Sequence, residues 1–227
     1  MGTTRAAPFL PPTGARTRAG VARPGDHDIV VVGAPVAAAR TASMFLVGLR
    51  GAFSLPLVLL LGGADDRARK NDQSEKAEKD GERLVSLQAH SALPVRVVDD
   101  KDPILPGRIH LAPADYHLFI DDDHFALSTA PPVNGARPSI DVLFGSVADS
   151  FGARAVCVLL GSDEHGDGRA GAAKVRARGG LVIVENPATA ALGVDAPRAE
   201  APLAAATVLH LSEIAPFVSN LGEWEAT

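Results

Sequence analysis

The chain has 227 residues, a single cysteine, 4% aromatic residues and a formal net charge of −5 at pH 7. This length suits one substantial domain with a large core. The acidic balance excludes the basic surface that nucleic-acid binding needs, and no segment reaches the roughly 18 consecutive apolar residues of a membrane span.

Residues 1–27 form the first distinct segment. They hold Arg5, Arg16, Arg18 and Arg23 among Pro, Gly, Thr and Ala, and they lack the continuous apolar stretch of a secretory signal. We predict a disordered tail here, because the segment offers little surface to bury; a partner-docking tail is the alternative. Residues 28–222 are expected to form one domain.

Short apolar runs and amphipathic stretches then alternate along the chain. Expected strands lie at 29–32, 55–61, 95–98, 108–111, 116–120, 125–127, 155–160 and 181–185, and expected helices at 37–48, 82–90, 139–150 and 168–178. Residues 64–81 are polar and favour a solvated loop, and residues 121–124 favour a hairpin turn. This order predicts an α/β fold with a doubly wound, mainly parallel sheet that carries a β-hairpin.

The only cysteine, Cys157, lies within the apolar run 155–160. Such a position favours a buried strand residue over a nucleophile. With one cysteine the chain cannot form an internal disulfide, which fits a reducing compartment, so we expect a cytoplasmic protein.

The segment 131–144, PPVNGARPSIDVLF, carries the most specific pattern. Its prolines disfavour helix up to Pro138, Ser139 can then cap a helix, and Asp141 falls in the first turn, near the positive end of the helix dipole. One face of this helix is expected to be buried, and it consists of Ile140, Leu143, Phe144 and Val147.

This segment resembles the P-P-V-N-x-x-R-P-S-[VI]-D-V-L-F segment in the catalytic domain of the chemotaxis protein-glutamate methylesterases, the CheB family. Residues 105–118 are similar to a second segment of that family, and Asp167-Gly168-Arg169-Ala170-Gly171 to a third. The resemblance covers roughly residues 28–221. It implies the doubly wound fold of the CheB C-terminal domain. Because only a short tail precedes the first expected strand, we do not expect the family's N-terminal receiver domain in this sequence.

The resemblance also implies a Ser-His-Asp hydrolase that acts on glutamyl methyl esters of a receptor. The family's G-A-S-T-G-G stretch corresponds to residues 33–38, which places Pro35 at the serine. Gly63 stands at the histidine of the family's Q-H pair. The third member, Asp167, remains as a vestigial triad acid, and we favour a structural role for it as a helix N-cap at Gly168.

Other polar residues could form a different site. Asp163, Glu164 and His165 gather in a loop at the carboxyl end of a strand, where with Asp167 they could hold a hard cation or act as acid and base; a solvated loop is the simpler interpretation. Asp121-Asp122-Asp123-His124 favours an exposed turn over a metal site. Ser43 and Ser54 are the hydroxyls nearest the lost serine, and neither is expected at a nucleophile elbow. We predict no cofactor and no bound metal.

Two functions remain. We favour a non-catalytic CheB-like binding or scaffold protein in a chemosensory-type signalling system, with a chemoreceptor-like protein or a CheB-family paralogue as partner and an oligomer as a possibility. The alternative is an active hydrolase, a protein-glutamate methylesterase or related esterase, that uses a rebuilt site around residues 163–167.

Overall fold

The computed structural model of the chain describes residues 26–62, 73–161, 166–187 and 206–222, and for residues 73–79 the backbone alone. The predicted tail therefore lies outside the described residues up to residue 25. The strands are β1 (Ile29–Pro35), β2 (Leu57–Gly62), β3 (Val95–Val97), β4 (Ile109–Leu111), β5 (His117–Asp121), β6 (His124–Ser128), β7 (Ala155–Leu159), β8 (Leu181–Glu185) and β9 (Thr207–Leu209). The α-helices are α1 (Ala39–Gly48), α2 (Gln73–Gln88), α3 (Ile140–Ser150), α4 (Arg169–Ala177) and α5 (Leu211–Leu221), and short 3-10 helices span Val36–Ala38 and Gly152–Arg154.

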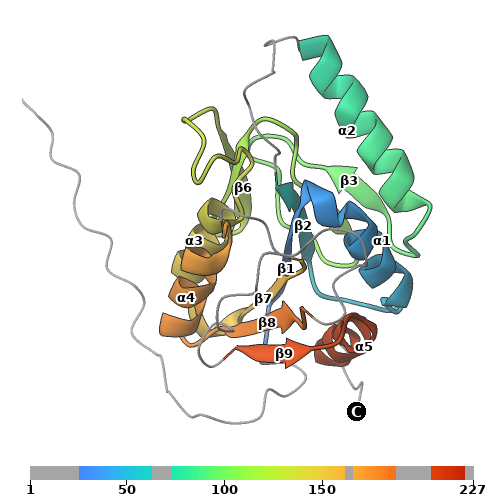
Figure 1. Cartoon of the computed structure of the whole chain (residues 1–227), viewed down its shortest axis with the longest axis vertical. Coiled ribbons are helices and arrows are strands. Elements are labelled where there is room, and N and C mark those ends of the chain that lie inside the picture. Colours follow the sequence, from blue (N-terminus) through green and yellow to red (C-terminus); the bar gives the residue numbers. More distant parts are fainter. Residues whose placement is uncertain (1–25, 63–72, 162–165, 188–205, 223–227) are drawn as a thin grey trace, which may run out of the picture.

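Seven strands form a parallel sheet in the order β3-β4-β2-β1-β7-β8-β9, and β5 pairs with β6 as a separate antiparallel hairpin. Helices α3 and α4 pack on one face, and α1 and α5 pack on the other (Figure 1). The predicted doubly wound α/β fold with a hairpin is confirmed. No helix in the described part of the chain has the length and apolar character to cross a membrane.

The centre of the sheet is β1, which pairs with β2 on one side and β7 on the other. Its residues Ile29, Val30, Val31 and Val32 are fully buried. Val30 and Val32 belong to the core under α1 and α5, whereas Ile29 and Val31 belong to the core under α3 and α4. A strand covered on both faces needs a continuous apolar run rather than an alternating one, and β1 supplies it.

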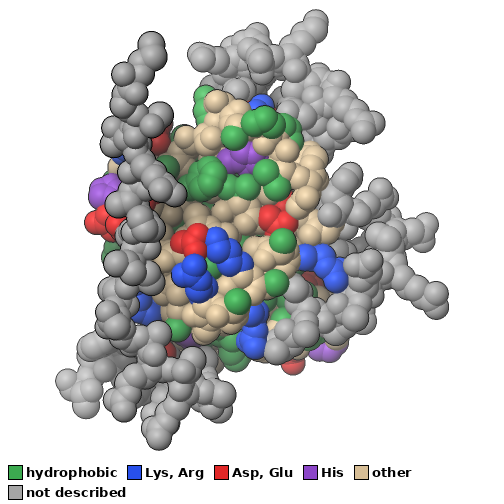
Figure 2. Space-filling model, turned by 90° about the vertical axis from the view of Figure 1, so that its left-hand side faces the viewer, with side chains coloured by type: hydrophobic (Ala, Val, Ile, Leu, Met, Phe, Trp, Pro, Cys, Tyr) green, Lys and Arg blue, Asp and Glu red, His purple; other side chains and the backbone are tan. Residues whose placement is uncertain are grey.

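Helix α3 begins as expected. The Ser139 side chain accepts a hydrogen bond from the Val142 N–H at 3.4 Å, Asp141 lies in the first turn, and the predicted apolar face is buried. Against α4, Asp149 forms ion pairs with Lys174 at 2.5 Å and Arg178 at 3.0 Å. Figure 2 shows this side of the molecule, where basic side chains gather beside acidic ones over the two helices.

Three elements differ from the expectations. Helix α2 begins at Gln73 rather than at residue 82, within the stretch expected to be a loop. That stretch is rich in Glu, Lys and Gln, which favour helix but give no apolar periodicity. The elements β9 and α5 were not expected: β9 has only three residues, and α5 contains Pro216, a residue that disfavours a helix interior.

Helix α5 tolerates Pro216 because its start is well capped and its inner face is deeply buried. The His210 N–H donates to the Glu213 carboxylate at 2.9 Å in a capping box. Ile214, Ala215 and Val218 pack into the core on the α1 side. The packing of α5 against the core thus outweighs the unfavourable effect of Pro216 on the helix.

Candidate functional site

The carboxyl ends of β1, β2, β7 and β8 meet at one edge of the sheet, which is where ligand sites lie in doubly wound folds. Pro35 ends β1 and pairs in register with Gly62 at the end of β2. Pro35 is buried, with φ −63° and ψ 154°. It brings neither a hydroxyl nor an N–H to this edge. Gly63, the position that corresponds to the family histidine, lies outside the described residues.

The space around Pro35 is closely filled. A Cβ added to Gly161, just beyond β7, would lie 2.8 Å from the Cβ of Ala38 and 3.7 Å from the Pro35 ring. From the opposite side Ile140 fills the edge, because a Cβ at Gly33 would lie 2.4 Å from its Cγ2. The position that corresponds to the nucleophile is therefore packed among small and apolar groups.

Asp167 is buried, with 5% of its surface exposed, and it binds the N-terminus of α3. Its carboxylate accepts hydrogen bonds from the Ser139 hydroxyl at 2.7 Å, the Ile140 N–H at 2.8 Å and the Asp141 N–H at 3.0 Å. Helix α4 has Gly168, at φ +95°, as its N-cap. The sequence predicted a capping role at Gly168, whereas these three contacts lie at the start of α3, a helix remote in sequence.

Burial raises the pKa of Asp167 above its ordinary value, and the hydrogen bonds from Asp141, Ile140 and Ser139 oppose that rise. The N-terminus of α3 also carries the positive end of a helix dipole, which favours a carboxylate. This arrangement can hold a helix start in place. It can also hold a proton more tightly than an exposed aspartate does.

Ser139 is the hydroxyl that the structure brings to the aspartate, and the sequence indicated it only as a helix cap. It is fully buried and donates to Asp167 while it accepts the Val142 N–H. Nucleophilic attack needs an accessible hydroxyl with a base that takes its proton. Buried between a carboxylate and a helix start, Ser139 fits a structural role.

Two further carboxylates at this edge were missed as functional candidates. Asp141 accepts hydrogen bonds from the Asn134 amide and the Gly171 N–H, both at 2.7 Å, and so ties the loop before α3 to the start of α4. Glu185 ends β8 with 4% of its surface exposed. Its Oε2 accepts the Gly161 N–H at 2.8 Å, while its buried Oε1 has no hydrogen-bond partner among the residues that the structure describes. Burial raises the pKa of Glu185, and the Gly161 N–H opposes this. The sequence signal that could have identified Glu185 is its position as a charged residue directly after the apolar run 181–184.

Of the remaining candidates, those that the structure describes do not join this cluster. Asp163, Glu164 and His165 lie outside the described residues. Ser43 lies within α1, where its hydroxyl donates to the Ala39 carbonyl, and the Ser54 hydroxyl donates to the Gly222 carbonyl, so neither lies at the end of β1. Residues 121–124 are exposed at the turn of the β5–β6 hairpin, and the described residues contain no group of three or more side chains that could hold a metal ion.

Cys157 is fully buried in β7, as predicted, and burial raises the pKa of its thiol. A thiol that is both inaccessible and protonated is not a nucleophile.

Comparisons with known proteins agree with the fold and the motifs. Residues 73–218 match the family model of the CheB methylesterases. A candidate protein-glutamate methylesterase/protein-glutamine glutaminase of Leptospira interrogans is 28% identical over 199 residues, which cover 87% of this chain and 96% of that protein. Protein-glutamate methylesterase/protein-glutamine glutaminase 4 of Geobacter metallireducens is 31% identical over 159 residues, covering 69% of this chain and 42% of that protein.

A solved structure gives the same result. The crystal structure of the Thermotoga maritima CheB methylesterase catalytic domain superimposes with a TM-score of 0.70 and 25% sequence identity. The match covers 86% of this chain and 98% of that domain.

Proposed function

Because this chain belongs to the CheB methylesterase family, we propose that it is a non-catalytic member, a binding or scaffold protein in a chemosensory-type signalling system. The observation that carries the proposal is Pro35, buried at the end of β1 where the family motif has its serine. Covalent acyl transfer needs an activated nucleophile, and a proline ring supplies none.

The contacts of Asp167 support the same proposal. In a catalytic triad the carboxylate orients an imidazole, but here it is bound by the Ser139 hydroxyl and two backbone N–H groups at the start of α3. These contacts stabilise the start of α3, a role that an aspartate at this position can have without any catalysis. Its presence is therefore weak support for a working triad.

The partner we propose is a protein, either a chemoreceptor-like protein or a paralogue of the same family. Names of the relatives, which include protein-glutamate methylesterase, point to glutamate side chains of proteins as what those relatives act on. A member without the nucleophile would keep the ability to bind such a segment while leaving its methyl esters intact.

The test is release of methyl groups from a glutamyl-methylated receptor peptide, followed by mass spectrometry, together with binding of the same peptide measured by calorimetry. We expect binding without methyl release above the rate of the peptide alone. Turnover by the unaltered chain would contradict the proposal, and absence of binding would leave the paralogue as the partner to be tested by the same method.

The alternative function, a hydrolase rebuilt around residues 163–167, is favoured by one observation: Asp167 lies at the carboxyl edge of the sheet with a raised pKa, as expected of an acid catalyst. It predicts turnover that disappears in Asp167→Asn. Circular dichroism of this variant separates loss of chemistry from loss of folding.

A further inference from the structure

A two-residue turn, Asn134-Gly135, forms the tip of the loop that precedes α3. On either side of it the Val133 N–H donates to the Ala136 carbonyl at 3.0 Å, and the Ala136 N–H donates to the Val133 carbonyl at 2.9 Å. Both turn residues are exposed, with φ +51° at Asn134 and +73° at Gly135, the left-handed backbone that this pair adopts readily in hairpin turns. The turn thus places a side-chain amide directly before an unhindered backbone nitrogen.

The side chain of Asn134 ties this tip to the starts of two helices. Its Nδ2 donates to Asp141 Oδ2 at 2.7 Å, and Asp141 Oδ1 accepts the Gly171 N–H at 2.7 Å. The base of the loop is held separately by Arg137, whose Nη1 donates to two backbone carbonyls at 3.1 Å and 3.2 Å. The amide donor of Asn134 is therefore what joins the tip to Asp141.

The backbone nitrogen of Gly135 can attack the Asn134 side chain. A bond forms from this nitrogen to Asn134 Cγ, its proton passes to solvent, and the bond from Cγ to Nδ2 breaks as the amide takes up a proton and leaves as ammonia. Water then opens the five-membered ring at either carbonyl, which yields aspartate or isoaspartate. Glycine has no Cβ to hinder the approach, and among the residues that the structure describes the Gly135 N–H has no hydrogen-bond acceptor.

The other asparagines that the structure describes are poorly suited to this reaction. Asn186 precedes Pro187, which has no N–H to lose. Asn220 lies within α5 and precedes Leu221, a buried and bulky residue whose backbone is helical. Reactivity is therefore concentrated at Asn134.

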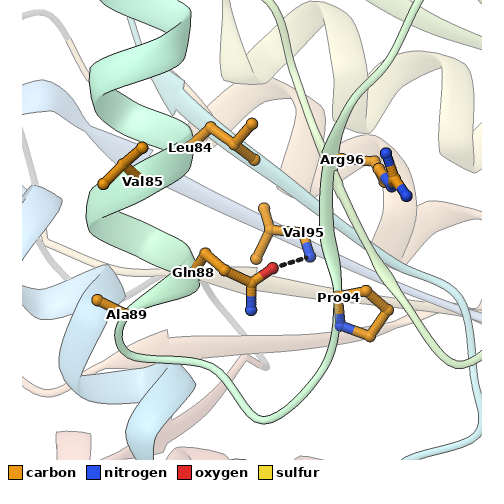
Figure 3. A pocket seen from close by; sticks show the side chains of 7 residues that line it. All are labelled: Leu84, Val85, Gln88, Ala89, Pro94, Val95 and Arg96. Atoms are coloured by element: carbon orange, nitrogen blue, oxygen red, sulfur yellow. Dashed lines mark hydrogen bonds between the residues drawn. The ribbon is translucent and has the colours of Figure 1, made fainter.

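Gln88 shows how a side-chain amide is protected. Its Oε1 accepts the Val95 N–H at 2.9 Å (Figure 3), and its Nε2 donates to the Leu93 carbonyl at 3.2 Å, so the amide is held at both ends. A glutamine would also have to close a six-membered ring. Asn134, by contrast, is held only through its nitrogen among the hydrogen bonds of the described residues.

We propose that Asn134 is a modification site, converted without an enzyme to aspartate and isoaspartate, and that the conversion releases the tip of the loop from α3 and α4. The product carries a carboxylate in place of the NH2 group, so it cannot donate to Asp141, and two carboxylates at this distance repel each other. Because the Asp141 N–H also binds Asp167, the change alters the surface beside the candidate site. The inference does not depend on whether the chain hydrolyses esters.

The first test follows the reaction itself. The full chain is incubated at about pH 6 and about pH 8, digested at acidic pH and mapped by mass spectrometry. We expect conversion of Asn134 to a mixture of aspartate and isoaspartate, faster at the higher pH because the attacking nitrogen must lose its proton. Asn220 in the same digest is the control and is expected to react at least about tenfold more slowly.

Two results of this test overturn the proposal. One is an Asn134 that stays unchanged in the folded chain while a free peptide of residues 131–137 is converted under the same conditions. The other is conversion to aspartate without isoaspartate, because only the ring opens to both products.

The second test concerns the release of the tip. Asn134→Asp reproduces the aspartate product and is expected to speed hydrogen exchange in residues 129–137. Adding Asp141→Asn restores the pair with its roles exchanged, since the new amide donates to the carboxylate while its oxygen still accepts the Gly171 N–H, and exchange should slow again. Asn220→Asp is the matched control and should leave this segment unchanged. Exchange in Asn134→Asp equal to that of the unaltered chain, or a double variant as fast as the single one, contradicts the release.

Discussion

At the scale of single residues, Asp167 joins two segments that are far apart in sequence. Asp167→Ala would leave the buried N–H of Ile140 and the N–H of Asp141 without their acceptor. Each unsatisfied buried donor costs about 1–3 kcal/mol, so we expect a loss of about 2–5 kcal/mol in the free energy of unfolding. Urea denaturation measures it.

Asp167→Asn is the conservative companion. Its amide oxygen can still accept hydrogen bonds, but its NH2 group would face a backbone N–H, so we expect a smaller loss of about 1–2 kcal/mol. Glu82→Gln, at an exposed carboxylate on α2, is the control and should change stability by less than about 0.5 kcal/mol. Equal stability of Asp167→Ala and the control would refute the structural role.

Glu185 gives a prediction with a defined pH dependence. Burial raises its pKa in the folded chain, so the folded state holds the proton more tightly than the unfolded state does. Stability contributed by the protonated form is therefore present below the ordinary glutamate pKa of 4.5 and is lost as pH rises through the raised value.

Glu185→Gln removes this titration while its amide oxygen still accepts the Gly161 N–H. At pH 7 we expect the variant to be more stable than the unaltered chain by on the order of 1 kcal/mol, because it places no charge in this buried position. Thermal melts between pH 4 and pH 8 should show the difference shrinking toward low pH. A difference that stays constant over this range would show that the charge of Glu185 is not its cause.

At the scale of elements, the close contact of α3 with α4 depends on a glycine. A Cβ on Gly171 would lie 2.6 Å from the Phe144 Cβ and 2.9 Å from the Asp141 carbonyl oxygen. Gly171→Ala must push the two helices apart, and we expect a loss of about 1–3 kcal/mol despite the better helix propensity of alanine.

Gly145, within α3, provides the matched comparison. A Cβ there would meet only the Lys174 Nζ, at 3.9 Å, so Gly145→Ala is expected to stabilise the chain by about 0.5–1 kcal/mol. Denaturant melts of the two variants give both signs in one experiment. The prediction fails if both substitutions shift stability in the same direction.

The elements also show what the sequence could and could not predict. Helix α3 was predictable in full, because its cap, its first-turn acid and its buried face all lie within residues 139–147. Helix α5 was not, because Pro216 disfavours a helix locally while the packing of Ile214 and Val218 acts from distant parts of the chain. Sequence patterns thus predict those helices and strands that are determined by residues of the same segment.

The same distinction applies to the candidate site. Pro35 and Asp167 were identified from motifs; Pro35 ends β1, and Asp167 directly precedes the N-cap of α4. The partners of Asp167 were not predictable: Ser139, Ile140 and Asp141 lie 26–28 positions away. Glu185 was missed because the sequence does not show that its carboxylate accepts a hydrogen bond from the Gly161 N–H, which lies at the end of a different strand.

At the scale of the whole molecule, the parallel sheet implies a gradient of local stability. The central strand β1 is paired on both sides and buried on both faces, whereas β3 and β9 are three-residue strands with one neighbour each. Backbone groups open most readily where few buried contacts hold them. We therefore expect hydrogen exchange to be slowest in β1, intermediate in β2 and β7, and fastest in β9.

Hydrogen–deuterium exchange followed by mass spectrometry measures this gradient directly. Exchange in β9 as slow as in β1 would contradict the gradient, because it would mean that the short edge strand opens only when the whole sheet unfolds.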